Sequence, residues 1–129
     1  MAVTCRRGPS FYNGHIAMKQ KVKAKYPIER YEARARIAKA LAHSSRLLML
    51  DALADGEMCV CELTELVGAD QSTVSKHLAV LKQAGIVADR KEGTMTFYRL
   101  KVGCLRGFWQ CLESVLRDNI KAQQAALGT

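Results

Sequence analysis

Two cysteines separated by a single residue are the feature of this sequence best suited to chemistry. Cys59 and Cys61 flank Val60 at the start of a run with helical spacing. Residues two positions apart in an α-helix point about 200° away from each other. Both thiols can therefore bind one ion only if Cys59 lies outside the helix or the first turn opens. Ligand binding here would deform the helix, as expected of a switch.

Thiolates are soft ligands that favour ions such as Cd²⁺, Pb²⁺ or trivalent arsenic over Mg²⁺ or Ca²⁺. Two thiolates seldom hold a metal alone, so a third donor is expected. Candidates are Cys5, near the N-terminus, and Cys104 and Cys111, which lie seven residues apart near the C-terminus. The alternative is that Cys59 and Cys61 are small buried apolar side chains, because free cysteine is often found in protein cores.

Charge is distributed unevenly along the 129 residues, whose net charge is +8. Residues 1–40 hold ten basic and two acidic side chains. Residues 41–70 hold one basic and six acidic side chains, and residues 71–101 hold six basic and two acidic side chains. Two basic segments around an acidic one favour a polyanion such as DNA as partner. The alternative is that these charges form a solvated surface.

Composition indicates one soluble domain, since 49% of the residues are hydrophobic and 25% are charged. Apolar runs are too short for a membrane span or a signal peptide. We therefore expect a cytoplasmic protein without a membrane partner, whose five cysteines are reduced rather than disulfide-bonded.

Hydrophobic periodicity predicts helices at 28–42, from Ser44 or Ser45 to about 54, at 60–67, at 71–84 and at 102–123. Residues 15–25 are a weaker helical candidate. Strand-like segments at 86–90 and 94–100 flank Lys91-Glu92-Gly93, a hairpin signal. Gly68 is expected to end the third main helix and Asp70 to cap the fourth. The predicted organisation is a flexible basic arm (1–27), a folded domain (28–123) and a short tail (124–129).

The last predicted helix has an apolar face longer than so small a domain can cover. Its members are Leu105, Phe108, Trp109, Leu112, Val115, Leu116 and Ile120. Such a face predicts a homodimer formed through the terminal helices. The alternative is that the helix packs only on its own core.

A short helix, a tight turn, a longer helix and a basic hairpin follow the order of a winged helix-turn-helix. The predicted fold is thus mainly α with a small β-hairpin. With Val74, Leu78 and Leu81 turned inward, polar side chains of helix 71–84 could read DNA and the hairpin could contact its backbone. The candidate DNA-binding residues are Gln71, Ser72, Thr73, Ser75, Lys76, Arg90 and Lys91. The alternatives are a winged helix used for protein contacts and, for His77, a structural rather than a DNA-binding role.

Several motifs together resemble the ArsR/SmtB family. They are Met58-Cys59-Val60-Cys61-Glu62-Leu63, Gln71-Ser72-Thr73-Val74-Ser75-Lys76-His77-Leu78, Arg90-Lys91-Glu92-Gly93 and Tyr98-Arg99-Leu100. The resemblance covers about residues 28–118. It implies a dimeric winged helix-turn-helix repressor that leaves its operator DNA when a metal or metalloid binds.

Within the family, Cys59 and Cys61 match the thiolate positions of arsenite-, cadmium- and lead-sensing members. Arsenite sensors often have a third cysteine where this chain has Thr64. Cadmium and lead sensors take further thiolates from an N-terminal arm, a role that Cys5 could fill. The zinc sensors of the family bind their ion on the last helix through histidine and acidic residues. That site is not expected here, because the matching positions are Val102, Cys104, Val115 and Asp118.

We therefore expect a homodimeric repressor whose inducer is arsenite or antimonite, or else Cd²⁺ or Pb²⁺, bound by Cys59, Cys61 and Cys5. A product starting at Met18 would lack Cys5, and the third donor would then be Cys104, Cys111 or a small thiol. One alternative is the same repressor with a redox or persulfide switch, and another is a thiol metallochaperone. No catalytic constellation or catalytic cofactor is expected.

Overall fold

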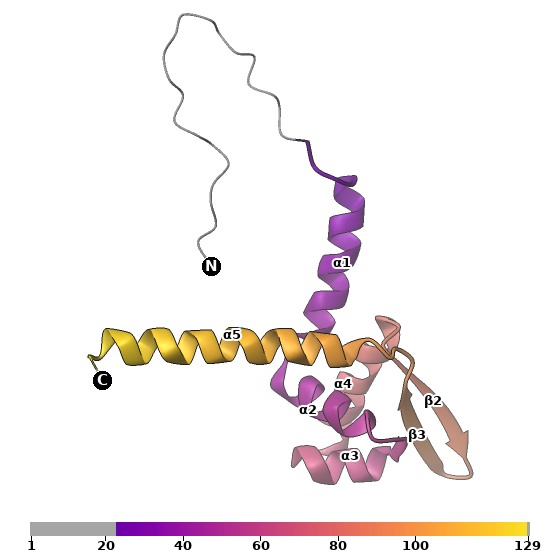
Figure 1. The fold of residues 1–129 in the computed structure, drawn as a ribbon. Coiled ribbons are helices and arrows are strands. Elements are labelled where there is room, and N and C mark those ends of the chain that lie inside the picture. The colour runs from indigo at the N-terminus through magenta and orange to yellow at the C-terminus, as the bar shows by residue number, and fades with distance from the viewer. Residues whose placement is uncertain (1–22, 129) are drawn as a thin grey trace, which may run out of the picture.

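The computed structural model describes residues 23–128, which form five helices and one small antiparallel sheet (Figure 1). Cys5 and most of the candidate helix at 15–25 lie outside the described residues. The elements in chain order are α1 (Ile28–Leu41), α2 (Ser44–Leu53), β1 (Met58–Cys59), α3 (Val60–Val67), α4 (Gln71–Gln83), β2 (Val87–Glu92), β3 (Met95–Leu100) and α5 (Leu105–Ala126). This is the mainly helical winged arrangement that the sequence predicts.

The sheet has three strands in the order β1-β3-β2, one more than the predicted hairpin. Strand β1 is only two residues long and pairs Met58 with Tyr98 and Cys59 with Phe97. The turn of the hairpin is also tighter than predicted, because Lys91 and Glu92 continue β2 and pair with β3. Gly93 adopts a φ of +62°, which glycine tolerates without a steric penalty, so the chain reverses there.

Helix α4 packs on α2, α3 and the sheet through one apolar face. Val74, Leu78 and Leu81, the predicted stripe, are fully buried. They pack in one cluster with side chains of α2 and α3, including Met49, Leu50 and Leu63. Burial of this stripe orients the opposite face of α4 towards solvent.

The turn between α3 and α4 is set by two predicted residues. Gly68 ends α3 with a φ of 72°, and the carboxylate of Asp70 accepts a hydrogen bond from the backbone N–H of Thr73. Helix α2 differs from prediction, because its N-cap is His43 rather than Ser44 or Ser45. The His43 Nδ1 accepts from the Ser45 N–H, at 3.1 Å.

Helices α1 and α5 project away from the compact body in different directions (Figure 1). Helix α5 begins at Leu105 and continues to Ala126, so it takes in part of the predicted tail. Val115, Leu116 and Ile120 are 53–55% exposed, whereas Leu105 is buried. None of the helices in residues 23–128 is long and apolar enough to cross a membrane.

Candidate nucleic-acid interface and cysteine site

The outer face of α4 is polar and accessible. Gln71, Ser72, Thr73, Ser75 and Lys76 are all exposed, because the buried stripe lies on the other side of the helix. Amide and hydroxyl groups can donate to and accept from base edges in a major groove, and a lysine can pair with a phosphate. The geometry therefore gives this helix a surface with the chemistry that reading DNA requires.

The first turn of α4 is already occupied by its own cap. Asp70 accepts from the Thr73 N–H at 3.1 Å and from the Ser72 Oγ at 3.0 Å. These hydrogen bonds lower the pKa of Asp70, with the largest contribution from Thr73. The resulting carboxylate opposes an anion at this helix end, whereas Lys76, one turn further along α4, is an exposed cation.

The two predicted wing cations differ in their surroundings. The Arg90 guanidinium donates from Nε to both carboxylate oxygens of Glu57, at 2.9 and 3.0 Å, and from Nη1 to Glu92, at 2.7 Å. It also lies over the ring of Phe97, with its central carbon 4.5 Å from the centroid. Lys91 is exposed and has no ion-pair partner among the described residues. Lys91 is therefore the wing cation that is open to a phosphate.

The same pairing shifts the pKa values of these groups. The hydrogen bonds with Arg90 lower the pKa of Glu57, and those with Glu57 and Glu92 raise the pKa of Arg90 above its ordinary value. On the neighbouring helix, Lys82 forms an ion pair with Asp89 at 2.9 Å, which raises the pKa of Lys82. Lys82 thus fastens α4 to β2.

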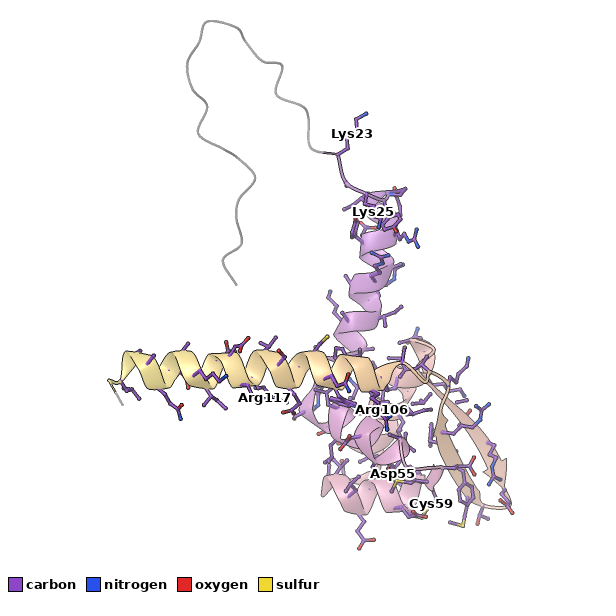
Figure 2. The ribbon with its side chains drawn as sticks, viewed as in Figure 1. Lys23, Lys25, Asp55, Cys59, Arg106 and Arg117 are labelled. Atoms are coloured by element: carbon purple, nitrogen blue, oxygen red, sulfur yellow. A yellow bond between two sulfur atoms is a disulfide. The ribbon has the colours of Figure 1, made fainter. Side chains whose placement is uncertain are left out.

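Cys59 lies just outside α3, which is one of the two arrangements that bring the sulfurs together. Cys59 ends β1 and is the N-cap of α3, and its Sγ accepts from the Glu62 N–H at 3.3 Å. The Cα atoms of Cys59 and Cys61 are 5.3 Å apart, and their sulfurs form a disulfide. The expectation of reduced thiols is not met at this pair. Figure 2 labels Cys59 at the junction of α3 and the sheet.

The two sulfurs have different access to solvent. Cys59 is only 1% exposed, whereas Cys61 is exposed, so a ligand would approach from the Cys61 side. A carboxylate oxygen of Glu62 lies 3.3 Å from Cys59 Sγ. No group of three or more potential metal ligands occurs within residues 23–128. Cys5, the third ligand expected from the sequence, lies outside that range.

Cys104 and Cys111 are free and exposed. Cys104 immediately precedes α5 and Cys111 lies in its second turn. Seven residues of helix separate two side chains by about 10 Å along the axis, so one chain cannot clamp one ion with both.

A polar junction that the sequence did not predict joins three helices. Arg46 of α2 donates from Nε to the Ala40 carbonyl at 2.6 Å and lies with Nη1 3.2 Å from His77 Nδ1. The ring of His43 packs against that of His77, with centroids 4.2 Å apart. His77 therefore links α4 to α2 directly and to α1 through Arg46, which supports the structural role favoured from the sequence.

The sequence of this chain is similar to those of known transcriptional regulators. A family model described as bacterial regulatory protein, arsR family, matches residues 43–89. An HTH-type transcriptional regulator of Methanocaldococcus jannaschii is 49% identical over 72 residues, which cover 55% of this chain and 81% of that protein. The chain belongs to the ArsR family. As an ArsR-family protein it is a DNA-binding transcriptional regulator and not an enzyme.

Two further relatives show how far the likeness extends. The arsenic resistance transcriptional regulator ArsR1 of Pseudomonas putida is 45% identical over 65 residues, which cover 50% of this chain and 51% of that protein. A solved homodimeric winged helix-turn-helix DNA-binding domain from Mycobacterium bovis, a possible ArsR-family regulator, has a TM-score of 0.64 at 29% identity. That alignment covers 79% of this chain and 94% of the solved chain. ArsR-family membership thus rests on the domain that contains α2, α3 and α4.

Two side-chain partnerships could not be predicted from the sequence. Glu57, which holds Arg90, lies 33 residues before it, and no local pattern links the two. Arg46 lies 31 residues before His77 and looks like an ordinary surface cation in the sequence. Both partnerships depend on tertiary packing, which periodicity does not reveal.

Proposed function

We propose that this protein is a homodimeric repressor that leaves its operator when arsenite or antimonite binds Cys59 and Cys61. The observation that supports the proposal most is the meeting of the two sulfurs at the start of α3. Helix α3 packs directly against α4, the candidate DNA-reading helix. A ligand that draws Cys59 out of its capping position removes a hydrogen bond from the first turn of α3 and disturbs the support of α4.

DNA binding is assigned to the exposed face of α4 and to the wing. Gln71, Ser72, Thr73 and Ser75 would face base edges, and Lys76 and Lys91 would pair with phosphates. Arg90 also belongs to this surface, but it reaches a phosphate only by giving up Glu57 or Glu92. The proposed location is the cytoplasm, with operator DNA as partner and no membrane partner.

Thiolate chemistry supports the choice of inducer. Trivalent arsenic takes three sulfur ligands, and each As–S bond replaces an As–O bond of arsenite while the thiol proton leaves with the oxygen as water. Cys59 and Cys61 supply two of these sulfurs, and Cys5 is the proposed third. A fourth donor would favour Cd²⁺ instead, and Pb²⁺ is the other thiophilic alternative. No catalytic cofactor is part of the proposal.

Dimerisation is assigned to the terminal helices. Both helices expose large apolar side chains, which a second copy of the chain could bury. They are Val115, Leu116 and Ile120 of α5 and Ile28 and Ile37 of α1. The solved relative that is a homodimer has the same winged helix-turn-helix architecture.

The test is fluorescence anisotropy of the reduced full chain on DNA from its own promoter, titrated with arsenite, Cd²⁺, Pb²⁺ and Zn²⁺ at fixed salt. We expect arsenite to release the DNA at about one equivalent per chain. Cys59→Ser and Cys61→Ser should bind DNA but resist release, and Cys5→Ser should weaken release. Cys111→Ser removes the free, exposed cysteine of α5 and should be released like the wild type if Cys5 is the third donor. Release of Cys59→Ser by arsenite at the wild-type concentration would refute the assignment.

A second candidate is favoured by the disulfide itself. Oxidation of the two thiols by a peroxide or persulfide would transfer two electrons to the oxidant, release two protons and form the Cys59–Cys61 bond. Mass spectrometry distinguishes the candidates. A redox switch removes the two thiol hydrogens from the chain when the DNA is released, whereas arsenite binding needs no oxidant and forms no disulfide. Release by oxidant alone, reversed by dithiothreitol, would favour the redox switch.

A further inference from the structure

Glu57 and Arg90 form a direct link between the cysteine segment and the wing. Glu57 lies two residues before Cys59, at the entry to β1, and Arg90 lies in β2 near the middle of the wing. Their side chains make a forked contact, in which the Arg90 Nε and Nη2 both donate to the Glu57 carboxylate. The Glu57 side chain is only 29% exposed although it carries a charge.

The sheet brings these residues together through a single row. Cys59 of β1 pairs with Phe97 of β3, and Phe97 pairs in turn with Arg90 of β2. The Arg90 guanidinium covers the Phe97 ring. The Glu57 side chain extends across β3 and forms an ion pair with the same guanidinium. The cysteine segment and β2 are therefore joined by this ion pair as well as by the strand pairing. A change at Cys59 thus has two short routes to Arg90, one through the strand and one through Glu57.

Paired in this way, Arg90 contributes little positive charge to the wing. Two carboxylates, those of Glu57 and Glu92, lie within hydrogen-bonding distance of its guanidinium. A phosphate can replace only one of these partners at a time, and Arg–carboxylate pairs with two parallel hydrogen bonds are the stronger ones. The position of Glu57 therefore fixes the Arg90 side chain, and with it the wing, relative to the cysteine segment.

We propose that the Glu57–Arg90 ion pair transmits the state of the Cys59–Cys61 pair to the wing and so makes wing placement depend on the cysteines. The inference rests on the proposed function in that it takes the cysteine pair to be the sensor. Only Met58 separates Glu57 from Cys59, so a ligand that displaces Cys59 from the N-cap of α3 also displaces Glu57. Arg90 then loses its forked partner, and the wing moves away from the position that DNA binding requires.

The matched variants are Glu57→Gln and Glu92→Gln. Both remove one carboxylate partner of Arg90 and nearly preserve side-chain size, but only Glu57 belongs to the cysteine segment. The first measurement is the ratio of the DNA dissociation constants with and without arsenite for the full chain. We expect a ratio of about 5- to 150-fold in the wild type, the usual range for coupled sites. The ratio should fall by about fivefold or more in Glu57→Gln and stay at the wild-type value in Glu92→Gln.

A second measurement needs no inducer. Dithiothreitol gives the disulfide two electrons and two protons, and the backbone amide shifts of residues 90–95 are compared by NMR before and after reduction. We expect these amides to shift in the wild type and in Glu92→Gln and to be nearly unchanged in Glu57→Gln. Unchanged wing amides in the reduced wild type would overturn the inference, and so would equal shifts in the wild type and Glu57→Gln.

The two measurements separate the inference from the proposed function. If arsenite does not release the wild type but the wing amides respond to reduction only when Glu57 is present, the inducer is wrong and the coupling stands. If arsenite releases the wild type and Glu57→Gln equally, the sensor stands and the coupling is refuted. Thermal unfolding checks that both variants fold, which we expect because exposed ion pairs contribute little to stability.

Discussion

The Arg46 guanidinium on α2 lies 3.2 Å from Nδ1 of His77 on α4. Arginine has no acceptor, so the arginine donates and His77 accepts, which requires a proton-free Nδ1. Burial lowers the pKa of His77, and the neighbouring His43 and Arg46 lower it further. Helix α4 is thus held in place by a histidine whose neutral form the fold favours.

This junction predicts a loss of stability in mild acid. Below the ordinary histidine pKa of 6.5 the unfolded chain binds a proton at His77 that the folded chain resists, so the free energy of unfolding falls as the pH decreases. The contribution is fully present above that pH and is lost as the pH falls through the lowered pKa. Urea midpoints measured between pH 7.5 and pH 5.5 should therefore decrease.

The control for this prediction is His77→Gln, whose amide oxygen can still accept from Arg46 but does not titrate. Its urea midpoint should change less over the same range. The carboxylates of Asp70 and Glu57 change little over this range, because their hydrogen bonds lower the pKa of each from its ordinary value. Equal pH dependence in the wild type and His77→Gln would contradict the prediction.

The N-cap of α4 predicts a difference between two substitutions of Asp70. Asp70→Ala removes the acceptor of the Thr73 N–H and should lower both the urea midpoint and the affinity for DNA. Asp70→Asn keeps a capping oxygen, so its urea midpoint should remain closer to that of the wild type. If alanine and asparagine behave alike, the cap is not what stabilises the start of α4.

The core predicts a large effect of Leu78→Ala. The Leu78 side chain is fully buried among α2, α3 and α4, and its truncation should reduce the free energy of unfolding by about 2–5 kcal/mol. Val80→Ala, two residues later on an exposed part of the same helix, should change it by less than about 0.5 kcal/mol. Chemical denaturation of both variants is the measurement, and similar losses would show that this face of α4 is misassigned.

Phosphate contact predicts a change in the salt dependence of DNA binding. Lys76→Ala should weaken binding to all sequences and reduce the slope of log affinity against log salt by about 1. Lys121→Ala on α5, which removes an equal charge remote from α4, is the control and should leave the slope unchanged. A wild-type slope in Lys76→Ala would remove this lysine from the DNA-binding surface.

The apolar face of α5 predicts that charge there prevents self-association. Leu116→Glu places a carboxylate at an exposed apolar position and should raise the dissociation constant of the dimer by about a hundredfold or more. Gln110→Glu adds the same charge on the polar side of the helix and serves as the control. Sedimentation equilibrium measures both, and an unaffected Leu116→Glu dimer would exclude this face from the interface.

Local signals were enough to predict most of the helices from the sequence. The periodic leucines and valines, Gly68 and Asp70 each act over a few residues, so α3 and α4 begin and end close to where periodicity and capping place them. Strand β1 escaped prediction because two residues have no periodicity of their own. It exists because β3 offers an unpaired edge to Met58 and Cys59.

The candidate site was predictable in its residues but not in its partnerships. The chemistry of Cys59 and Cys61 is visible in their spacing, and the exposure of Gln71, Ser75 and Lys76 follows from the buried stripe. Arg90 looked like a free cation, because a single sequence does not reveal that Glu57 folds against it. The disulfide likewise depends on how closely the N-cap position brings Cys59 to Cys61, which composition alone does not indicate.

The dual role of Cys59 sets a trade-off for this protein. The same sulfur accepts the capping N–H of Glu62 and is the proposed ligand atom, so a ligand that moves this sulfur also weakens the cap of α3. A chain with a better cap, such as serine or aspartate, would have a more stable α3 and no soft ligand. In the proposed function, the weaker cap that sulfur provides is therefore what allows Cys59 to respond to a ligand.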